Sequence, residues 1–463
     1  MSCKVCFDFI CDEALIFSNV GKKMQEQGIA VCGISLGGRW KHAREGFDVY
    51  SLDLMDDQEI DWQSELKRIS KQYIKYNPAG FTQADRFVSQ LDRELQRKIL
   101  VFTFLKIEEI VSAGVTIFIT TGVAYLYNLV ILAVSDHFCI RAISLYGARQ
   151  PEPRFTFSLS KGGVWDKVNK QHLEIRKNKS IELKEEVAYV ESFREKAKNP
   201  DYMSSARQLG GVRWVFIQEF INRLKNWYFN GWDNPADYIT QHPVWYAWRD
   251  VKRILNKKYI NLMFKFDKPS AEDEYYIYPL HLQPEASTLI LGDDYVDQLN
   301  TIKAISKRLP ADKVLYVKEH PAAYGRHSVT FYKGIQKIHN VKLIHYREDA
   351  RKLILGSNGV VVISGTMGWE ALLLGVPAIV LGSVFYESFD GVRKIETLKQ
   401  LTSYFQDIPV SVPSIKDGAV ALKAIQLGSY QGYFDVHKLD TTKKALSSEN
   451  LDLLYNGLHE ILE

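Results

Sequence analysis

Two polar segments in the second half of the chain combine residue types that can bind a phosphate. Lys318-Glu-His-Pro321 closes an apolar run that predicts a strand, and Ser364-Gly-Thr366 follows another such run and opens a helix. A histidine can donate a hydrogen bond or a proton to a phosphate, and a lysine can neutralise part of its charge. Because both segments follow strands of one predicted sheet, together they could clamp one phosphate.

His320 and Lys318 are the candidate phosphate ligands after the first of these strands. Pro321 fixes the backbone just beyond the histidine, so that the ring can be held toward a cleft. A second His-Pro pair, His242-Pro243, follows no predicted strand, and we expect it to be structural.

The turn of Ser364, Gly365 and Thr366 is the stronger signal. Hydroxyl groups and free amides at a helix N-terminus form an anion site, and Gly365 would let a ligand approach the backbone closely. The alternative is an ordinary N-cap without a ligand. Glu370, in the early turns of the same helix, could reach the ribose hydroxyls of a nucleotide, or it could simply stabilise the positive helix end.

Two further segments point to the same edge of the predicted sheet. If their segment is extended, the side chains of Gln283 and Glu285, two residues apart, could point to the same side. Glu285 is the candidate base or nucleophile. Its alternative is a capping loop before the next helix. Tyr386, in the segment that follows the strand Pro377–Leu381, could stack on a base or a sugar, or the segment could be a loop anchored by a buried aromatic residue.

The elements that must position these residues follow the pattern of parallel α/β sheets. In the second half we expect strands over Tyr275–Leu280, Val314–Lys318, Val341–Ile344, Gly359–Ile363 and Pro377–Leu381. The helices expected between them include Ala350–Leu355 and Met367–Leu374. In the first half we expect strands over Lys4–Ile10, Ile29–Ser35, Val115–Ile119 and Cys139–Ser144, with helices over Ala14–Gln27 and Val123–Val134. Ligands of such sheets bind outside the carboxyl ends of the strands.

Composition narrows the class of protein further. The chain has 463 residues, and its hydrophobic content of 46% excludes a disordered chain. Its formal net charge of +4 does not favour a nucleic-acid binder. Cys3 and Cys6 form a C-x-x-C motif without a second pair, so no zinc site is expected. The uncharged stretch Ile110–Ser135 is long enough to cross a bilayer, but it is better explained as a strand, a break and a buried helix.

Between about residues 159 and 272 the pattern changes to long helices. These helices are rich in tryptophan and tyrosine, and the tryptophans that fall here include Trp214, Trp227, Trp232, Trp245 and Trp248. One interpretation is a helical insert that packs as a structural bridge. The other is an aromatic and basic face that rests on a membrane surface or a lipid-linked acceptor.

At this point the sequence resembles the bacterial capsule polysaccharide biosynthesis family, which includes β-Kdo transferases of capsule and lipopolysaccharide assembly. The similarity covers chiefly residues 275–390. The motifs that carry it are Gln283-Pro284-Glu285, Lys318-Glu319-His320-Pro321, Ser364-Gly365-Thr366 with Glu370-Ala371, Gly375-Val376-Pro377, and Gly382 to Tyr386.

This resemblance implies a GT-B-like α/β fold, with two Rossmann-like doubly wound domains facing a cleft and a helical insert between them. The expected parts are an acceptor-side domain (1–158), the Trp-rich insert (159–272), a nucleotide-sugar-binding domain (273–410) and C-terminal helices that pack back toward the N-terminal domain (411–463). By the resemblance, His320, Ser364 and Thr366 hold the nucleotide phosphate and Glu285 matches a carboxylate associated with retention. No metal is expected, because histidine, lysine and helix amides neutralise the charge.

The expected function is that of a cytoplasmic, metal-independent glycosyltransferase of surface polysaccharide biosynthesis. Its donor would be CMP-linked, carrying Kdo or a related acid, and its acceptor a glycan or a lipid-linked glycan. The nucleotide sugar is a substrate, and no cofactor is expected. Peripheral contact with the inner membrane or with an assembly complex is a further expectation. The alternatives are a nucleotide-sugar epimerase or hydrolase, and a non-catalytic scaffold of the capsule-assembly complex.

Overall fold

The computed structural model describes residues 4–462 of the chain with internal gaps. The gaps are residues 39, 55–59, 149–152, 161, 179, 196–219, 222–223, 226–227, 229–237, 240–241, 407–410 and 435–438. The predictions for Cys3, Trp214, Trp227 and Trp232 therefore lie outside the described residues.

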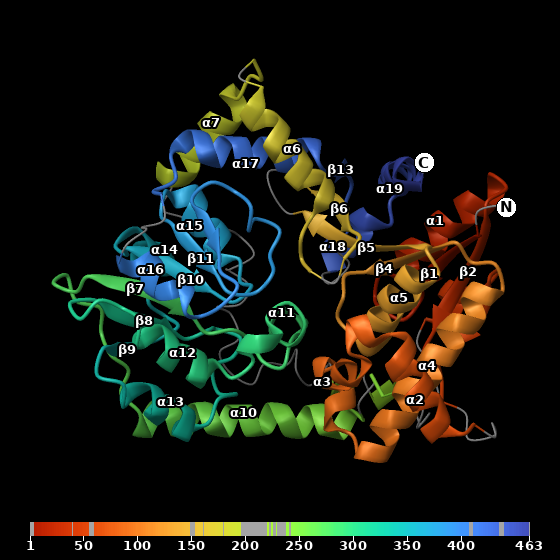
Figure 1. Cartoon of the computed structure of the whole chain (residues 1–463), viewed down its shortest axis with the longest axis horizontal. Helices are drawn as coiled ribbons and strands as arrows, with labels where there is room; N and C mark the ends of the chain where they lie inside the picture. Colours follow the sequence, from red (N-terminus) through yellow and green to blue (C-terminus); the bar gives the residue numbers. More distant parts are fainter. Residues whose placement is uncertain are drawn as a thin grey trace. The chain divides into compact units, whose positions relative to one another are not determined.

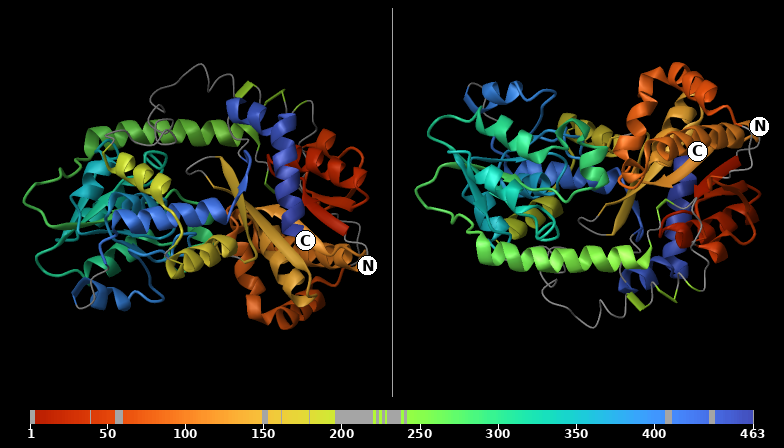
Figure 2. Two further views of the ribbon diagram at one scale, coloured as in Figure 1. Left: turned by 90° about the horizontal axis from the view of Figure 1, so that it is seen from above. Right: turned by 90° about the horizontal axis from the view of Figure 1, so that it is seen from below.

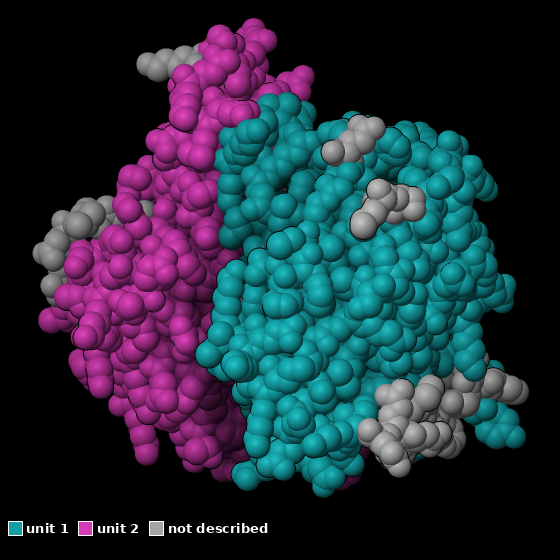
Figure 3. All heavy atoms as spheres, turned by 45° about the vertical axis from the view of Figure 1, so that its right-hand side comes forward, with its two compact units in different colours: residues 1–171, 221–243, 425–463 teal, residues 172–220, 244–424 magenta. Residues whose placement is uncertain are grey.

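The chain divides into two compact units, which Figure 3 colours separately. Unit 1 comprises residues 1–171, 221–243 and 425–463, and unit 2 comprises residues 172–220 and 244–424. The chain thus first enters unit 2 within helix α6 (Asp166–Lys177), and it leaves unit 2 for the last time within helix α17 (Ile415–Leu427). The four-part division expected from the sequence stays a prediction.

Unit 1 is built on a sheet with the strand order β13-β6-β5-β4-β1-β2-β3. Strands β1 to β5 are parallel, whereas β6 and β13 are antiparallel to their neighbours. The bounds are β1 Lys4–Asp8, β2 Ala30–Ser35, β3 Asp48–Ser51, β4 Ile117–Thr121, β5 Arg141–Ala148, β6 Arg154–Ser158 and β13 Tyr430–Gln431. The C-terminal segment therefore adds the last strand of this sheet.

Alternating side chains of β1 show that helices cover both faces of this sheet. Phe7 packs on Phe17 of α1 and belongs to a core that also holds residues of α19, whereas its neighbour Asp8 accepts a hydrogen bond from Tyr127 of α5 at 2.8 Å. The helices are α1 Ala14–Glu26, α2 Trp62–Gln72, α3 Phe81–Ala84, α4 Arg93–Ser112, α5 Leu126–His137, α18 Leu439–Ala445 and α19 Ser448–Leu462. Unit 1 is thus a doubly wound α/β unit.

Unit 2 contains a six-stranded sheet in which all strands are parallel. The strand order is β12-β11-β10-β7-β8-β9, so that the order in which the chain adds strands reverses between β7 and β10, at the topological switch point where such sheets bind ligands. The bounds are β7 Tyr275–Pro279, β8 Val314–Lys318, β9 Val341–Ile344, β10 Gly359–Val362, β11 Ala378–Val380 and β12 Val392–Lys394.

Helices pack on the unit 2 sheet (Figures 1 and 2), and α12, α13 and α14 begin at side-chain caps. Ile302 of α12 and Ile335 of α13 share one core with Leu315 and Val317 of β8. The side chain of Asp349 accepts hydrogen bonds from the backbone at the start of α14. The helices are α7 Lys184–Glu195, α10 Pro243–Met263, α11 Ala286–Leu289, α12 Gln298–Ser306, α13 Val329–Gln336, α14 Ala350–Leu355, α15 Met367–Leu374 and α16 Gln400–Gln406.

The expected fold class, α/β with two Rossmann-like doubly wound units, is confirmed. The uncharged stretch Ile110–Ser135 forms the end of α4, strand β4 and most of α5, as the breaks in its pattern predicted. No helix in the described part of the chain is both long enough and apolar enough to span a bilayer.

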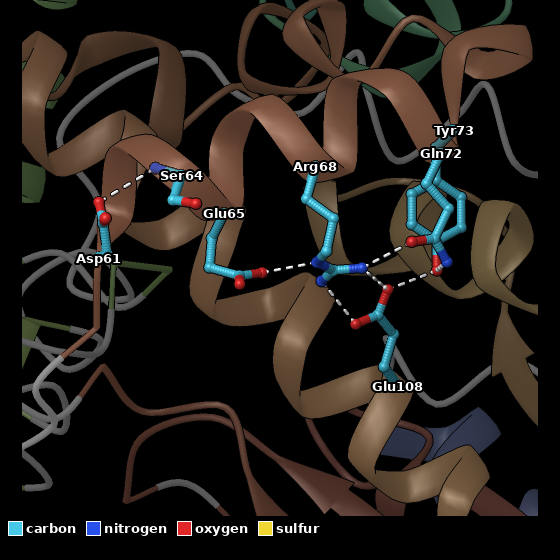
Figure 4. A network of polar contacts seen from close by, with 7 residues as sticks. All are labelled: Asp61, Ser64, Glu65, Arg68, Gln72, Tyr73 and Glu108. Carbon is cyan, nitrogen blue, oxygen red and sulfur yellow. Dashed lines mark hydrogen bonds and ion pairs between the residues drawn. The ribbon is translucent and has the colours of Figure 1, made fainter.

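A polar network joins helices α2 and α4 of unit 1 (Figure 4). Both guanidinium Nη atoms of Arg68 donate to the Glu108 carboxylate, at 3.0 and 2.7 Å, and the Tyr73 hydroxyl donates to the same carboxylate at 2.6 Å. Glu65 accepts from Arg68 Nε at 2.7 Å. Because three hydrogen bonds from two side chains converge on Glu108, this carboxylate is the centre of the contact between the two helices.

We expect Glu108→Gln to lower the free energy of unfolding by about 2 kcal/mol, because an amide replaces a carboxylate that accepts several charge-assisted hydrogen bonds. Glu109→Gln is the matched control. Glu109 is half exposed, and its one ion pair among the described residues is with Lys106, at 2.8 Å, so we expect its loss to cost about 0.5 kcal/mol or less. Urea unfolding followed by circular dichroism measures both variants. Equal losses would contradict a central role for Glu108.

Candidate active site

A cavity of about 410 Å³ opens at the carboxyl ends of β7, β8, β9 and β10 in unit 2. It lies at the switch point of the sheet, and its volume falls in the range of about 300–1,000 Å³ that is usual for small-molecule sites. Its lining includes eight of the ten predicted site residues. These are Glu285, Lys318, His320, Pro321, Ser364, Gly365, Thr366 and Glu370.

The end of β8 supplies an ammonium group and an imidazole to the cavity. Lys318 is 4% exposed, and its Nζ donates to the Tyr346 carbonyl at 3.1 Å. Because Lys318 is the last residue of β8, strand pairing fixes its backbone on both sides. The ammonium group is therefore held at the cavity wall.

The backbone turn after His320 fixes the orientation of its ring. Nδ1 accepts a hydrogen bond from the Ala322 N–H at 3.1 Å, which leaves Nε2 as the protonated nitrogen of the neutral ring. Burial, together with the nearby charges of Lys318 and Arg326, lowers the pKa of His320 to about 4. At neutral pH the ring is thus an uncharged hydrogen-bond donor at the cavity wall.

Glu319, between these two residues, also lines the cavity. Its carboxylate accepts from the His320 N–H at 2.6 Å and from the hydroxyl of Tyr332. Burial raises the pKa of Glu319 to about 7, although both hydrogen bonds and Lys318 lower it. Glu319 therefore holds the backbone of His320 in place.

The Ser364-Gly365-Thr366 turn lies between the end of β10 and the start of α15. The Ser364 hydroxyl donates to the Ser287 carbonyl, and the Ser364 N–H donates to His281 Nε2 at 3.4 Å. The Thr366 side chain is exposed and makes no capping hydrogen bond. Of the two predicted hydroxyl ligands, Thr366 has its donor available to a ligand, whereas Ser364 uses its own to hold the neighbouring loop.

Glu285 and Gln283 occupy different positions, although both were expected to point into one site. Glu285 is half-buried at the cavity and accepts from the Ser287 hydroxyl at 2.9 Å. The Gln283 side chain donates to the Val296 carbonyl at 2.7 Å and accepts from Gln298 at 2.8 Å. Gln283 is not among the residues that line the cavity, and its contacts position the loop that carries Glu285.

Glu370 and Tyr386 likewise differ in their access to the cavity. Glu370 is buried and lines it from the first turn of α15. Tyr386 is also buried, but it does not line the cavity: its hydroxyl donates to the Gly365 carbonyl, and a Cβ at Gly368 would lie 2.5 Å from that hydroxyl oxygen. The tyrosine thus supports the turn from behind instead of stacking on a ligand at this cavity.

The structure adds lining residues that were not predicted to be functional. His281 is 6% exposed, and burial, with the charge of His320, lowers its pKa to about 3. Tyr346 and Glu348, after β9, form part of the wall. Their place after a third strand of the same sheet was the available signal, because residues after every strand meet at one edge.

Taken together, the cavity brings two uncharged imidazoles, one ammonium group, a free hydroxyl and several carboxylates to one edge of the sheet. The first turn of α15 adds backbone N–H groups that the helix does not pair. The donors can bind an anionic group, and the carboxylates Glu285 and Glu370 can accept from sugar hydroxyls or take a proton. Within the described part of the chain, no group of three or more His, Cys, Asp or Glu residues has the geometry of a metal site.

A sequence comparison with protein families finds one match in this region. The family is described as "Capsule polysaccharide biosynthesis protein", and the match covers residues 229–404. Residues 229–404 carry the sequence pattern of the capsule polysaccharide biosynthesis family. The resemblance inferred from the motifs is thereby confirmed over this part of the chain, which includes the whole cavity.

Solved structures with similarity to the chain include two β-Kdo transferases and an epimerase. The β-Kdo 2,7 transferase of Thermosulfurimonas dismutans KpsC has a TM-score of 0.34 and 11% identity, over 78% of this chain and 90% of that one. The β-Kdo 2,4 transferase of the same organism's KpsC has a TM-score of 0.29 and 12% identity, over 67% of this chain and 79% of that one. The UDP-GlcNAc 2-epimerase of Methanocaldococcus jannaschii has a TM-score of 0.24 and 11% identity, over 92% of this chain and 99% of that one. No curated protein matches the sequence.

Protonation of Glu319 makes a testable contribution to stability. Its pKa in the folded chain, about 7, lies above the ordinary value of 4.5, so the folded state binds the proton more tightly than the unfolded state. The resulting stabilisation is complete below pH 4.5 and is lost as the pH rises through about 7. We expect the wild type to lose about 2 kcal/mol of stability relative to Glu319→Gln between about pH 5 and pH 8.

Urea unfolding of both proteins at the two pH values measures this difference. Other titrating groups cancel, because they are common to both chains. Parallel pH profiles of the wild type and Glu319→Gln would contradict the buried, proton-binding carboxyl group.

Proposed function

We propose that the protein is a glycosyltransferase of capsule or lipopolysaccharide biosynthesis that binds a nucleotide-sugar donor in the cavity of unit 2. The observation that carries this proposal is the convergence of His320, Lys318 and Thr366 on one cavity at the switch point of a Rossmann-like sheet. The family match supports the biosynthetic context, because it spans this cavity.

The proposed reaction breaks the bond between the anomeric carbon of the sugar and the donor phosphate, and forms a bond from that carbon to an acceptor hydroxyl. Negative charge then develops on the departing phosphate. His320 donates from Nε2 to a phosphate oxygen, Lys318 neutralises part of the charge, and Thr366 with the first N–H groups of α15 binds the remaining oxygens. These groups stabilise the leaving phosphate without a metal ion.

Glu285 is proposed as the catalytic carboxylate. It either takes the proton of the acceptor hydroxyl or attacks the anomeric carbon as a nucleophile, and the two roles give opposite stereochemical outcomes for the product. Glu370 is proposed to accept hydrogen bonds from the ribose hydroxyls of the nucleotide. Ser364, Gly365, Gln283 and Tyr386 hold the loops that carry these groups.

We infer from the resemblance that the donor is CMP-linked and that its sugar is Kdo or a related acid. A nucleoside monophosphate presents one phosphate group, which matches a site with a single ammonium group at the end of β8. The acceptor would be a glycan or a lipid-linked glycan, and the enzyme would work in the cytoplasm with peripheral contact with the inner membrane.

Nucleotide binding should depend on His320. We expect CMP to raise the melting temperature of the wild type, because a ligand that binds only the folded state stabilises it. His320→Ala and Thr366→Ala should each weaken CMP binding about tenfold or more, through loss of one donor to the phosphate. His339→Ala, an exposed histidine away from the cavity, is the control.

Thermal shift with CMP, UDP, GDP and dTDP measures the preference. A diphosphate that stabilises the protein more than CMP would contradict the CMP-linked donor. If no nucleotide stabilises it, the scaffold interpretation replaces the transferase.

Glu285→Gln separates catalysis from binding. We expect the turnover number to fall by about 100-fold or more, because a general base or a nucleophile is removed, while CMP still stabilises the variant. Transfer of a labelled sugar to capsule glycan in vitro measures this effect. Full activity of Glu285→Gln, or full complementation of a capsule-deficient strain by it, would contradict the catalytic role.

A further inference from the structure

Helix α10 exposes an apolar stripe along its whole length. Of the nineteen exposed large hydrophobic residues in the described part of the chain, eight lie on this helix. Trp248 is 65% exposed, Leu255 58% and Leu262 82%. The eight are Val244, Trp245, Trp248, Val251, Leu255, Tyr259, Leu262 and Met263. Most are spaced by three or four residues and therefore share one face of the helix.

The opposite face of α10 is firmly packed, so the exposure of the stripe does not reflect a detached helix. Arg253 donates to the carbonyls of Ala322 and Tyr324, at 2.8 and 3.2 Å. Asn256 donates to two further carbonyls of the same loop, at 2.9 and 3.0 Å, and Ile260 is fully buried in the unit 2 core. In Figure 1 the helix runs beside α13 of this unit. The inner face of α10 therefore holds the loop that follows His320.

Positive charge flanks the stripe. Lys252 and Lys258 are both exposed, and they lie six residues apart, which places them about 120° apart around the helix, on either side of the apolar residues. The only acidic residue of α10, Asp250, lies 3.4 Å from Arg249. The outward surface of α10 thus combines an apolar stripe with two cationic edges.

This charge pattern discriminates between the possible occupants. If two copies paired through antiparallel helices centred on Leu255, Lys252 of each copy would face Lys258 of the other, and parallel pairing would also bring like charges together. A bilayer with anionic headgroups instead complements both edges while it covers the apolar stripe. Tryptophan and tyrosine, which the stripe contains, favour this interface.

We propose that α10 lies in the plane of an anionic membrane surface, with its stripe in the headgroup region. The helix has 21 residues and is about 31 Å long, so that it can present the whole stripe to one bilayer. This inference rests on the proposed function and extends it, because it assigns the expected membrane contact to one helix, α10. The packed inner face of α10 would then hold the donor cavity next to the lipid surface, where a lipid-linked acceptor is available.

The test uses the full-length chain and sedimentation with two kinds of vesicle, phosphatidylcholine alone and phosphatidylcholine mixed with phosphatidylglycerol. We expect the wild type to bind the mixed vesicles and to release them at high salt. Trp248→Glu with Leu255→Glu should weaken this partitioning about tenfold or more. The matched control, Ile74→Glu with Val412→Glu, changes two exposed apolar residues elsewhere and should bind as the wild type does.

Lys252→Gln with Lys258→Gln isolates the charge and should reduce binding to the mixed vesicles. Thermal stabilisation by CMP, measured on the same variants, reports the donor site separately, so that failure of the lipid contact and failure of the proposed function are distinguishable. The proposal is overturned if the wild type binds neither vesicle, or if the stripe variant binds as well as the control. It is also overturned if the stripe variant converts a dimer into a monomer in sedimentation velocity while lipid binding is unchanged.

Discussion

The hydrogen bond from the Ser364 hydroxyl to the Ser287 carbonyl ties together the two loops on which the site depends. These loops leave β7 and β10, the two neighbouring parallel strands between which the strand order reverses. At such a switch point the loops that leave the two neighbouring strands run to opposite sides of the sheet, and the space between these loops becomes a cavity. Because His281 also accepts from the Ser364 N–H, both loops are fixed to one buried side chain. Glu285 on one loop and Thr366 on the other are therefore held at a constant separation.

The electrostatics of the cavity favour hydrogen bonding over an excess of positive charge. The lining holds one lysine, and the pKa values of His281 and His320 are lowered to about 3 and about 4. A neutral imidazole can donate a hydrogen bond to an anion. Because it carries no charge, it avoids the free-energy cost of burying a second cation beside Lys318. Glu319 binds a proton below about pH 7 and so limits the negative charge beneath His320. Such a site suits one phosphate group better than a highly charged ligand.

Periodicity and turn residues were sufficient to predict most of the elements near the site. The predicted strand Val314–Lys318 and helices 350–355 and 367–374 agree with the structure residue for residue. They are bounded by clear breaks, such as Gly375, which adopts a positive φ of 81° at the end of α15. The α/β fold of both units followed from this regular alternation.

Side-chain direction could not be predicted in the same way, because it depends on contacts between residues far apart in the sequence. Gln283 and Tyr386 carry suitable groups at the right edge, but Gln298 and the Gly365 carbonyl hold them away from the cavity. His281 and Glu348 line the cavity without any motif that marks them. The sequence left open whether the Trp-rich helices form a structural bridge or an exposed aromatic surface. Only packing decides which face of α10 remains uncovered.

Hydrogen–deuterium exchange of the full-length protein, with and without CMP, tests the central claim most directly. If the cavity of unit 2 binds the nucleotide, CMP should slow exchange in three separate segments, 281–288, 318–324 and 364–370, because these supply its lining. Unit 1 should exchange at an unchanged rate. Protection confined to other segments, or no protection at saturating CMP, would contradict the account.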